Sequence, residues 1–290
     1  MPFPFSILLQ FQNFGVIMRV KAKFHIYPRK RECIMVLWSQ EHIKTLIPAL
    51  LVMAILSVFF RFVLGKKSLN VRMIPIQVIA VLLILLEIGK QVLSFRNGYD
   101  LYHIPLHYCS LFLFTLPAMA FYKGKHQQTV YGVTAGVCGA LFLFMLIYPE
   151  LIYSGSNIKN FFTDFFSMHT VAFHNLVMFA FLLIIALGVQ KPDPKRDVKG
   201  VVWFMIGFCV VSSTMAQILK TNFANFYVCN IPPLENLRLS IQNVLGYWPT
   251  QILYIVIVST LTVLFTVMSY HIYRALRRLT GKQEKHTAKV

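Results

Sequence analysis

Long apolar stretches separated by short polar segments fill most of the sequence. Each stretch approaches the ~20 residues that a helix needs to cross the hydrocarbon core of a membrane. The intervals between them contain Gly, Pro, Asn or charged residues, which favour turns. The seven stretches are residues 42–64, 73–93, 105–122, 130–148, 170–188, 201–219 and 249–270. The pattern predicts an all-α fold: a polytopic membrane bundle of seven transmembrane helices.

Composition narrows the class of protein. Of the 290 residues, 57% are apolar and 13% are charged, which excludes an ordinary soluble domain. The net charge of +18 arises from basic residues between the stretches and at the C-terminus, so we interpret them as topology signals and contacts to anionic membrane lipids. Nucleic acid is therefore not an expected partner. The five cysteines form no CxxC pair, which favours free thiols over a zinc ribbon or a disulfide framework.

The loops carry unequal positive charge. Fifteen Lys and Arg residues lie in the set of loops that includes the C-terminal tail. The opposite set holds only four: Arg96, Lys159, Lys220 and Arg238. By the positive-inside rule, the richer set is cytoplasmic. The prediction is a multi-pass protein of the cell membrane with its N-terminus outside and its C-terminus inside.

The first 34 residues do not fit this topology. They contain six basic residues that would lie outside the cell, and the apolar pattern becomes regular only after Met35. We interpret residues 1–34 as a dispensable basic extension from a start codon placed too far upstream. Residues 35–278 form the predicted seven-helix domain, and residues 279–290 form a basic cytoplasmic tail.

Polar side chains within or beside the stretches gather at the predicted outer side. A charged side chain inside a span costs at least ~2.5 kcal/mol, so Glu87 must face water or the bundle interior. A single outward-facing polar cavity accounts for this distribution. The residues that we expect to bind substrate there are Glu87, Gln91, His103, Asn243 and Trp248.

Two of these assignments have simpler alternatives. Glu87, Lys90 and Gln91 are spaced i, i+3, i+4, so they can neutralise one another as an internal ion pair. The aromatic residues within 222–248, which include Trp248, are typical of an interfacial belt, and a loop of this length can also serve as a lid.

One segment concentrates reactive side chains at the start of the third stretch: His103-Ile104-Pro105-Leu106-His107-Tyr108-Cys109-Ser110. On one helix, Cys109 would lie about 200° from His107, so a base for the thiol must come from elsewhere. His174, near the start of the fifth stretch, has a comparable depth. The alternative is that Cys109 is a small core residue and His174 a hydrogen-bonded interior histidine.

A metal site is a further alternative. His103, His107 and Ser110 would share one helix face, and His169, His174 or Glu87 could complete a set of ligands. The simpler interpretation places His103 at the headgroup level and lets His107 hydrogen-bond across helices.

Several segments carry a resemblance to a known family. They are Tyr99-Asp100-Leu101, residues 104–111, His174 opening the fifth stretch, and Leu245-Gly246-Tyr247-Trp248-Pro249. Over residues 35–273 the chain resembles the YwaF-like family of bacterial integral membrane proteins, which implies a bacterial plasma membrane. That family is distantly similar to eukaryotic membrane acyltransferases and fatty-acid-ester hydrolases that use a Cys or Thr nucleophile with a His. The resemblance implies Cys109 as nucleophile and His174 as base.

The leading hypothesis is therefore a lipid acyltransferase or lipid-ester hydrolase that acts on a lipid acyl substrate. Cys109 and His174 would be catalytic, with His107 as an oxyanion or orienting group, and neither a cofactor nor a metal is predicted. The alternative is a transporter or small-molecule-binding protein without covalent chemistry. A third possibility is a structural or partner-binding membrane protein.

Overall fold

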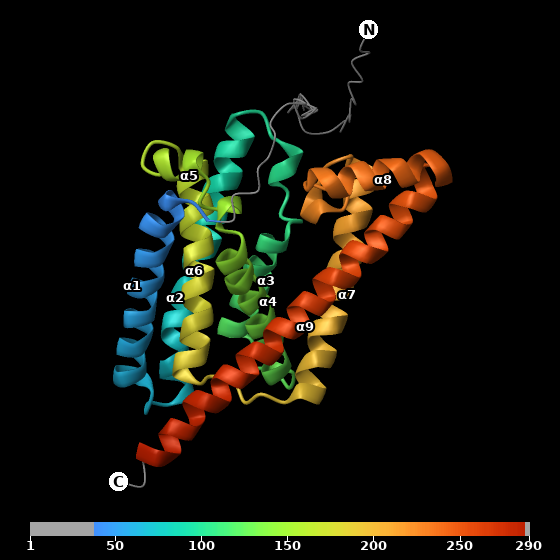
Figure 1. Cartoon of the computed structure of the whole chain (residues 1–290). Coiled ribbons are helices and arrows are strands. Elements are labelled where there is room, and N and C mark those ends of the chain that lie inside the picture. Colours follow the sequence, from blue (N-terminus) through green and yellow to red (C-terminus); the bar gives the residue numbers. More distant parts are fainter. Residues whose placement is uncertain (1–37, 288–290) are drawn as a thin grey trace, which may run out of the picture.

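The computed structural model describes residues 38–287, all of whose regular elements are helical (Figure 1). The α-helices are α1 (Gln40–Leu64), α2 (Leu69–Arg96), α3 (Phe112–Phe121), α4 (Gln127–Ile147), α5 (Gly155–Lys159), α6 (Phe165–Leu187), α7 (Pro194–Leu219), α8 (Pro232–Leu245) and α9 (Tyr247–Thr287). The 3₁₀ turns are η1 (Leu101–His103), η2 (Tyr108–Leu111), η3 (Pro149–Leu151) and η4 (Phe223–Asn225). The predicted extension 1–34 lies outside the described residues.

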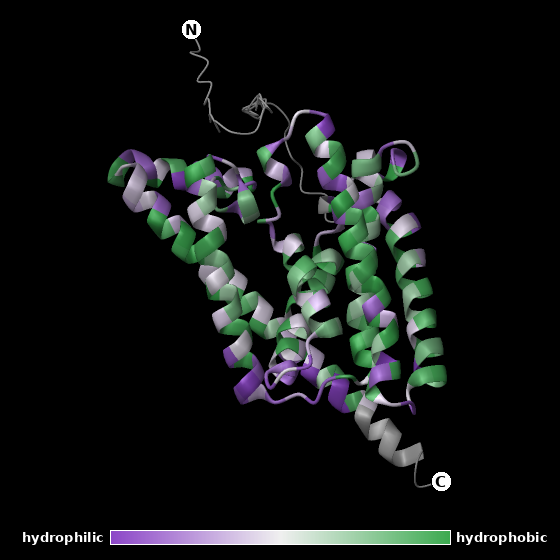
Figure 2. Ribbon diagram, turned by 180° about the vertical axis from the view of Figure 1, so that it is seen from behind, coloured by the Kyte–Doolittle hydropathy of each residue, from purple (hydrophilic) through white to green (hydrophobic). Residues whose placement is uncertain are grey.

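Six helices of the described chain are long and apolar enough to cross a membrane, namely α1, α2, α4, α6, α7 and α9. Figure 2 shows their middle portions as hydrophobic, with hydrophilic residues toward the two ends. The all-α membrane fold is confirmed.

The third predicted span is not a seventh long helix. It consists of a four-residue 3₁₀ turn, η2, followed by the ten-residue α3. Together these reach about 23 Å, which is less than the ~30 Å hydrocarbon core. Pro105 explains the conformation of Ile104, φ −58° and ψ 132°, because the residue before a proline is disfavoured in the α conformation. The helix starts later still, because His107 is also extended, with φ −82° and ψ 161°.

Helix α4 lies at the centre of the bundle. Of its membrane-spanning window 67% is buried, compared with 17% for α1 and 11% for α9. Glycines on α4 allow this packing: a Cβ on Gly132 would lie 2.6 Å from the Asp197 carboxyl carbon, and one on Gly139 would lie 2.7 Å from Ser269 Oγ. Small residues at such contacts let helices α7 and α9 approach closely.

Asp197 connects α7 to α9 near the end of the bundle opposite α8. Its carboxylate is fully buried and accepts hydrogen bonds from Tyr270 Oη at 2.6 Å and Gln190 Nε2 at 2.7 Å. The Asp193 N–H donates at 2.9 Å and Arg196 Nε at 2.7 Å. Four donors therefore hold one buried charge and fix the start of α7.

Three arginines from different helices converge on the C-terminal end of α6. Arg72 Nη1 donates to Leu187 O at 2.7 Å, and Arg277 Nη1 donates to Ile185 O at 2.9 Å. Arg61 adds a longer contact to the same turn. Cations are stabilising at this end because the last carbonyls of a helix carry partial negative charge.

Candidate functional site

Glu87 is the centre of a polar network between α2 and α6. Its Oε1 accepts from Lys90 Nζ at 2.8 Å and from Gln91 Nε2 at 2.6 Å. On α6, His169 Nε2 lies 3.4 Å from Glu87 Oε2. The Glu87 side chain is only 12% exposed, so the Lys90 cation offsets a charge that is largely withdrawn from water. The structure thus contains the internal ion pair that the i, i+3 spacing allows.

His103 belongs to the same network. Gln91 Nε2 also donates to His103 O at 2.8 Å, and Ser94 Oγ forms a 2.6 Å hydrogen bond with His103 Nδ1. The imidazole stacks on Phe166 of α6, with ring centroids 5.1 Å apart. Burial lowers the pKa of His103 below its ordinary value. These contacts fasten η1 to α2 and α6.

His107 connects the segment before η2 to η4. Its Nε2–H donates to Tyr102 O at 3.0 Å, and its Nδ1 accepts from the Ala224 N–H at 3.4 Å. Burial lowers the pKa of His107, which favours the neutral ring that can both donate and accept. Because both nitrogens are engaged, His107 in this conformation acts as a clamp and offers no free N–H to an oxyanion.

The prediction that His103, His107 and Ser110 share one helix face is wrong. His103 ends a 3₁₀ turn, whereas His107 has φ −82° and ψ 161°. No helix connects them, since Ile104 is held extended before Pro105. The angle of 200° between His107 and Cys109 does not apply either, because His107 is extended and Cys109 lies in a 3₁₀ turn.

Cys109 lies in η2 as a free, half-buried thiol packed against the hydrophobic core. Cys109 follows His103, which the network ties to α2, by six residues, and it forms none of the network's hydrogen bonds.

His174 is buried on α6, one helical turn beyond Thr170. Its Nδ1 lies 2.6 Å from Thr170 O, and because a carbonyl only accepts, Nδ1 carries the proton. The lone pair of the neutral ring is then on Nε2. His174 lies five residues beyond His169, the α6 residue that faces Glu87. No hydrogen bond joins the Cys109 thiol to His174 within residues 38–287.

Asn243 and Trp248 lie away from this network. Asn243 is exposed on α8, and Trp248, at the start of α9, is 63% exposed with its ring 5.2 Å from that of Tyr247. Neither contacts Glu87, Gln91 or His103. The structure thus divides the predicted substrate-binding residues into a buried group and an exposed pair.

Sequence reasoning did not assign the residues that anchor the network. Tyr99 Oη donates to Gln91 Oε1 at 2.9 Å, and Ser94 holds His103. His42 makes a separate polar contact that sequence reasoning also left unassigned: its Nε2 lies 2.9 Å from Glu150 Oε2 and ties α1 to η3. The capping-box spacing of Ser39 and His42 is the one sequence signal for it.

In the part of the chain that the structure describes, no group of three or more His, Cys, Asp and Glu side chains is placed to hold a metal ion. The metal alternative therefore gains no support from the geometry.

Comparison with protein families decides the classification. The TMEM164 family matches residues 37–270, from just before α1 to the middle of α9. This chain belongs to the TMEM164 family. No curated protein sequence and no solved structure matches it.

Membership of the TMEM164 family corrects the resemblance to the YwaF-like family. That resemblance rested on a few short motifs at the ends of apolar stretches, whereas the TMEM164 match covers all of α1 to α8. The expected location in a bacterial plasma membrane came from that resemblance alone and is no longer supported. The same holds for the assignment of Cys109 as nucleophile and His174 as base, for which only the geometry can now argue.

Proposed function

We propose that this TMEM164-family protein modifies membrane lipids by transferring or hydrolysing an acyl group, with Cys109 as the nucleophile and His174 as the general base. The supporting observation is that one buried polar network reaches both segments: its His169 precedes His174 on α6 by five residues, and its His103 precedes Cys109 by six. A thiolate is the reactive form of cysteine, and a nearby cation favours it.

The tautomer of His174 suits this role. With Nδ1–H bonded to Thr170 O, the Nε2 lone pair can take the Cys109 proton. The thiolate then attacks the carbonyl carbon of a lipid ester, and the departing alkoxide takes the proton back from Nε2. A second alcohol or water attacks the resulting thioester, which completes transfer or hydrolysis and restores the thiol.

The proposal requires Cys109 and His174 to approach each other when substrate binds. Catalytic hydrogen bonds are often long in structures without substrate and tighten in the reactive complex. Lys90, held by its ion pair with Glu87, would supply a cation from the same network to favour the negative charge that develops on sulfur or on the carbonyl oxygen.

The test is labelling of the purified full-length protein with an electrophilic lipid probe, read out by peptide mass spectrometry. We expect adducts on Cys109 and not on Cys138, which is 0% exposed. His174→Ala should slow the reaction by at least about 100-fold, the lower end of the range for loss of a general base. His103→Ala is the matched control and should change the rate much less. Equal rates in the parent and in His174→Ala would exclude the pair.

Transport is the second candidate, favoured by the interrupted third segment. The non-helical residues 104–107 directly follow His103, which Gln91 ties to the buried Glu87–Lys90 pair, and broken helices near buried charges are typical of transporters. Uptake of a solute into vesicles that persists in Cys109→Ser would favour this candidate over the enzyme.

A further inference from the structure

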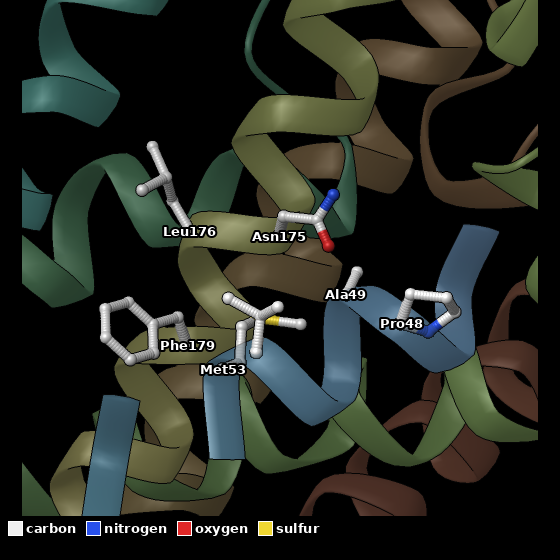
Figure 3. A pocket seen from close by; sticks show the side chains of 7 residues that line it. Pro48, Ala49, Met53, Asn175, Leu176 and Phe179 are labelled. Carbon is white, nitrogen blue, oxygen red and sulfur yellow. The ribbon is translucent and has the colours of Figure 1, made fainter. Parts of the chain in front are cut away.

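A groove of about 370 Å³ lies between α1 and α6, on the side of the bundle away from α7 and α8. Figure 3 shows the side chains along it: Pro48, Ala49 and Met53 from α1, and Asn175, Leu176 and Phe179 from α6. Both helices are long enough to cross a membrane, and the groove lies within their spanning portions.

The groove opens toward the hydrocarbon of the membrane. Val52, on its rim, is 55% exposed, and Leu51 and Ile55 beside it are 58% and 66% exposed. Side chains of this kind on a membrane-spanning helix face lipid tails. An occupant must therefore enter sideways from the bilayer, and the apolar walls suit a hydrocarbon chain.

Asn175 is the polar exception in the lining. Its Oδ1 accepts from Tyr153 Oη at 2.5 Å, and its Nδ2 donates to Val171 O at 3.0 Å. An amide nitrogen carries two hydrogens, so one N–H of Asn175 has no hydrogen-bond acceptor in the described chain. A free donor in a lipid-facing groove is unfavourable unless a ligand supplies the acceptor.

The two bonded contacts also fix the direction of the carboxamide. Tyr153 holds one side of the group and the preceding turn of α6 holds the other, so the amide cannot rotate freely toward the headgroup region. The donor is therefore a fixed feature of the groove.

We propose that this groove binds an ester-linked acyl chain of a membrane lipid, whose ester carbonyl accepts the free N–H of Asn175. The hydrocarbon lies along Ala49, Met53 and Phe179. Asn175 follows His174 in sequence, but successive residues on a helix point about 100° apart, so the groove is a different site from the Cys109–His174 pair. Its occupancy does not depend on the proposed enzymatic activity.

The experiment uses the full-length protein in lipid vesicles that contain a phosphatidylcholine with a diazirine in one acyl chain. After irradiation, mass spectrometry maps the adducts. We expect enrichment on residues 175–179 of α6 and on the facing turns of α1. Ala49→Trp, which fills the groove, should remove that enrichment, whereas Ile55→Trp, on the exposed side of α1, should leave it unchanged.

A second comparison tests the hydrogen bond without altering the fold. An ether-linked analogue of the probe lacks the carbonyl and should label the groove of the parent protein about fivefold less, the ratio that corresponds to a hydrogen bond of about 1 kcal/mol. Asn175→Leu should reduce labelling by the ester probe to the level of the ether probe.

Three results would overturn the proposal. Labelling spread evenly over lipid-facing residues such as Ile55 would show that the groove holds only bulk lipid. Crosslinks between two protein copies through α1 would assign the groove to a dimer contact. Equal labelling by the ester and ether probes would show that Asn175 does not bind the carbonyl.

Discussion

Removal of the Asp197 carboxylate should destabilise the protein severely. Asp197→Ala leaves the Tyr270 hydroxyl, the Gln190 amide and the Asp193 N–H without their acceptor in a region where Asp197 itself is 0% exposed. Each buried unsatisfied donor costs about 1–3 kcal/mol, and loss of one partner of a buried charged group costs about 3–5 kcal/mol. We therefore expect a loss of at least about 3 kcal/mol in the free energy of unfolding.

A double-mutant cycle separates the contribution of Tyr270. Tyr270→Phe removes one hydrogen bond to a charged acceptor and should cost about 1.5 kcal/mol, since three other donors remain on Asp197. Once Asp197 is alanine, Tyr270→Phe should cost much less or even restore stability, because it removes an unsatisfied hydroxyl.

The assay is unfolding in mixed detergent micelles with increasing SDS, followed by the reactivity of the Cys138 thiol. Cys138 is 0% exposed on α4 and becomes reactive only when the bundle opens. Asp193→Ala is the control and should cost only about 1 kcal/mol through loss of a helix cap. A change below about 0.5 kcal/mol in Asp197→Ala, the size typical of surface substitutions, would refute the reasoning.

Three further predictions concern packing, pH and topology. Gly139→Ala should lower the free energy of unfolding by about 1–3 kcal/mol, because the added Cβ overpacks the contact. Gly207→Ala should instead stabilise α7 by up to about 1 kcal/mol, because a Cβ there meets nothing within 4 Å. SDS unfolding of both variants checks this. Burial alone would raise the pKa of Glu235, but the Arg238 guanidinium holds it below its ordinary value. The stability that this pair gives α8 should be present above the ordinary carboxyl pKa and be lost as the pH falls through the lowered pKa of Glu235. Limited proteolysis between pH 6 and pH 3 should therefore cleave α8 only at the acid end. A cysteine at Gly155 should react with an impermeant reagent from outside the cell while a reporter at the C-terminus reads as cytoplasmic; the reverse pattern would contradict the charge count.

Hydrophobic length was sufficient to predict the long helices. Apolar runs of about 20 residues have few alternatives in a membrane, because every backbone polar group must be satisfied within the segment. The third stretch shows the limit of that reasoning. Residues 105–122 are apolar enough for a span, but residues 105–107 are not helical. Pro105 disfavours the α conformation only at Ile104, whereas His107 is extended where its ring binds Tyr102 O and the Ala224 N–H. Contacts of this kind are not visible in the hydropathy of the stretch.

The contacts that decide the site depend on packing between distant segments. Asp197 and Tyr270 are 73 residues apart, and His107 and Ala224 are 117 apart. No periodicity within one helix predicts which faces of two helices meet. The spacing of Glu87, Lys90 and Gln91 did indicate their ion pair, because all three lie on one face of α2.

The polar residues near Cys109 differ in what their hydrogen bonds hold. Glu87, Gln91, His103 and His107 bind one another or nearby backbone, so they fix the positions of η1 and η4. His174 binds only a carbonyl of its own helix, through Nδ1, and no hydrogen bond of the described chain engages its Nε2. A neutral imidazole in this tautomer can accept a proton at Nε2. If Cys109 and His174 form the proposed pair, Nε2 is therefore the atom that takes the thiol proton, and His174→Ala is the change that removes it.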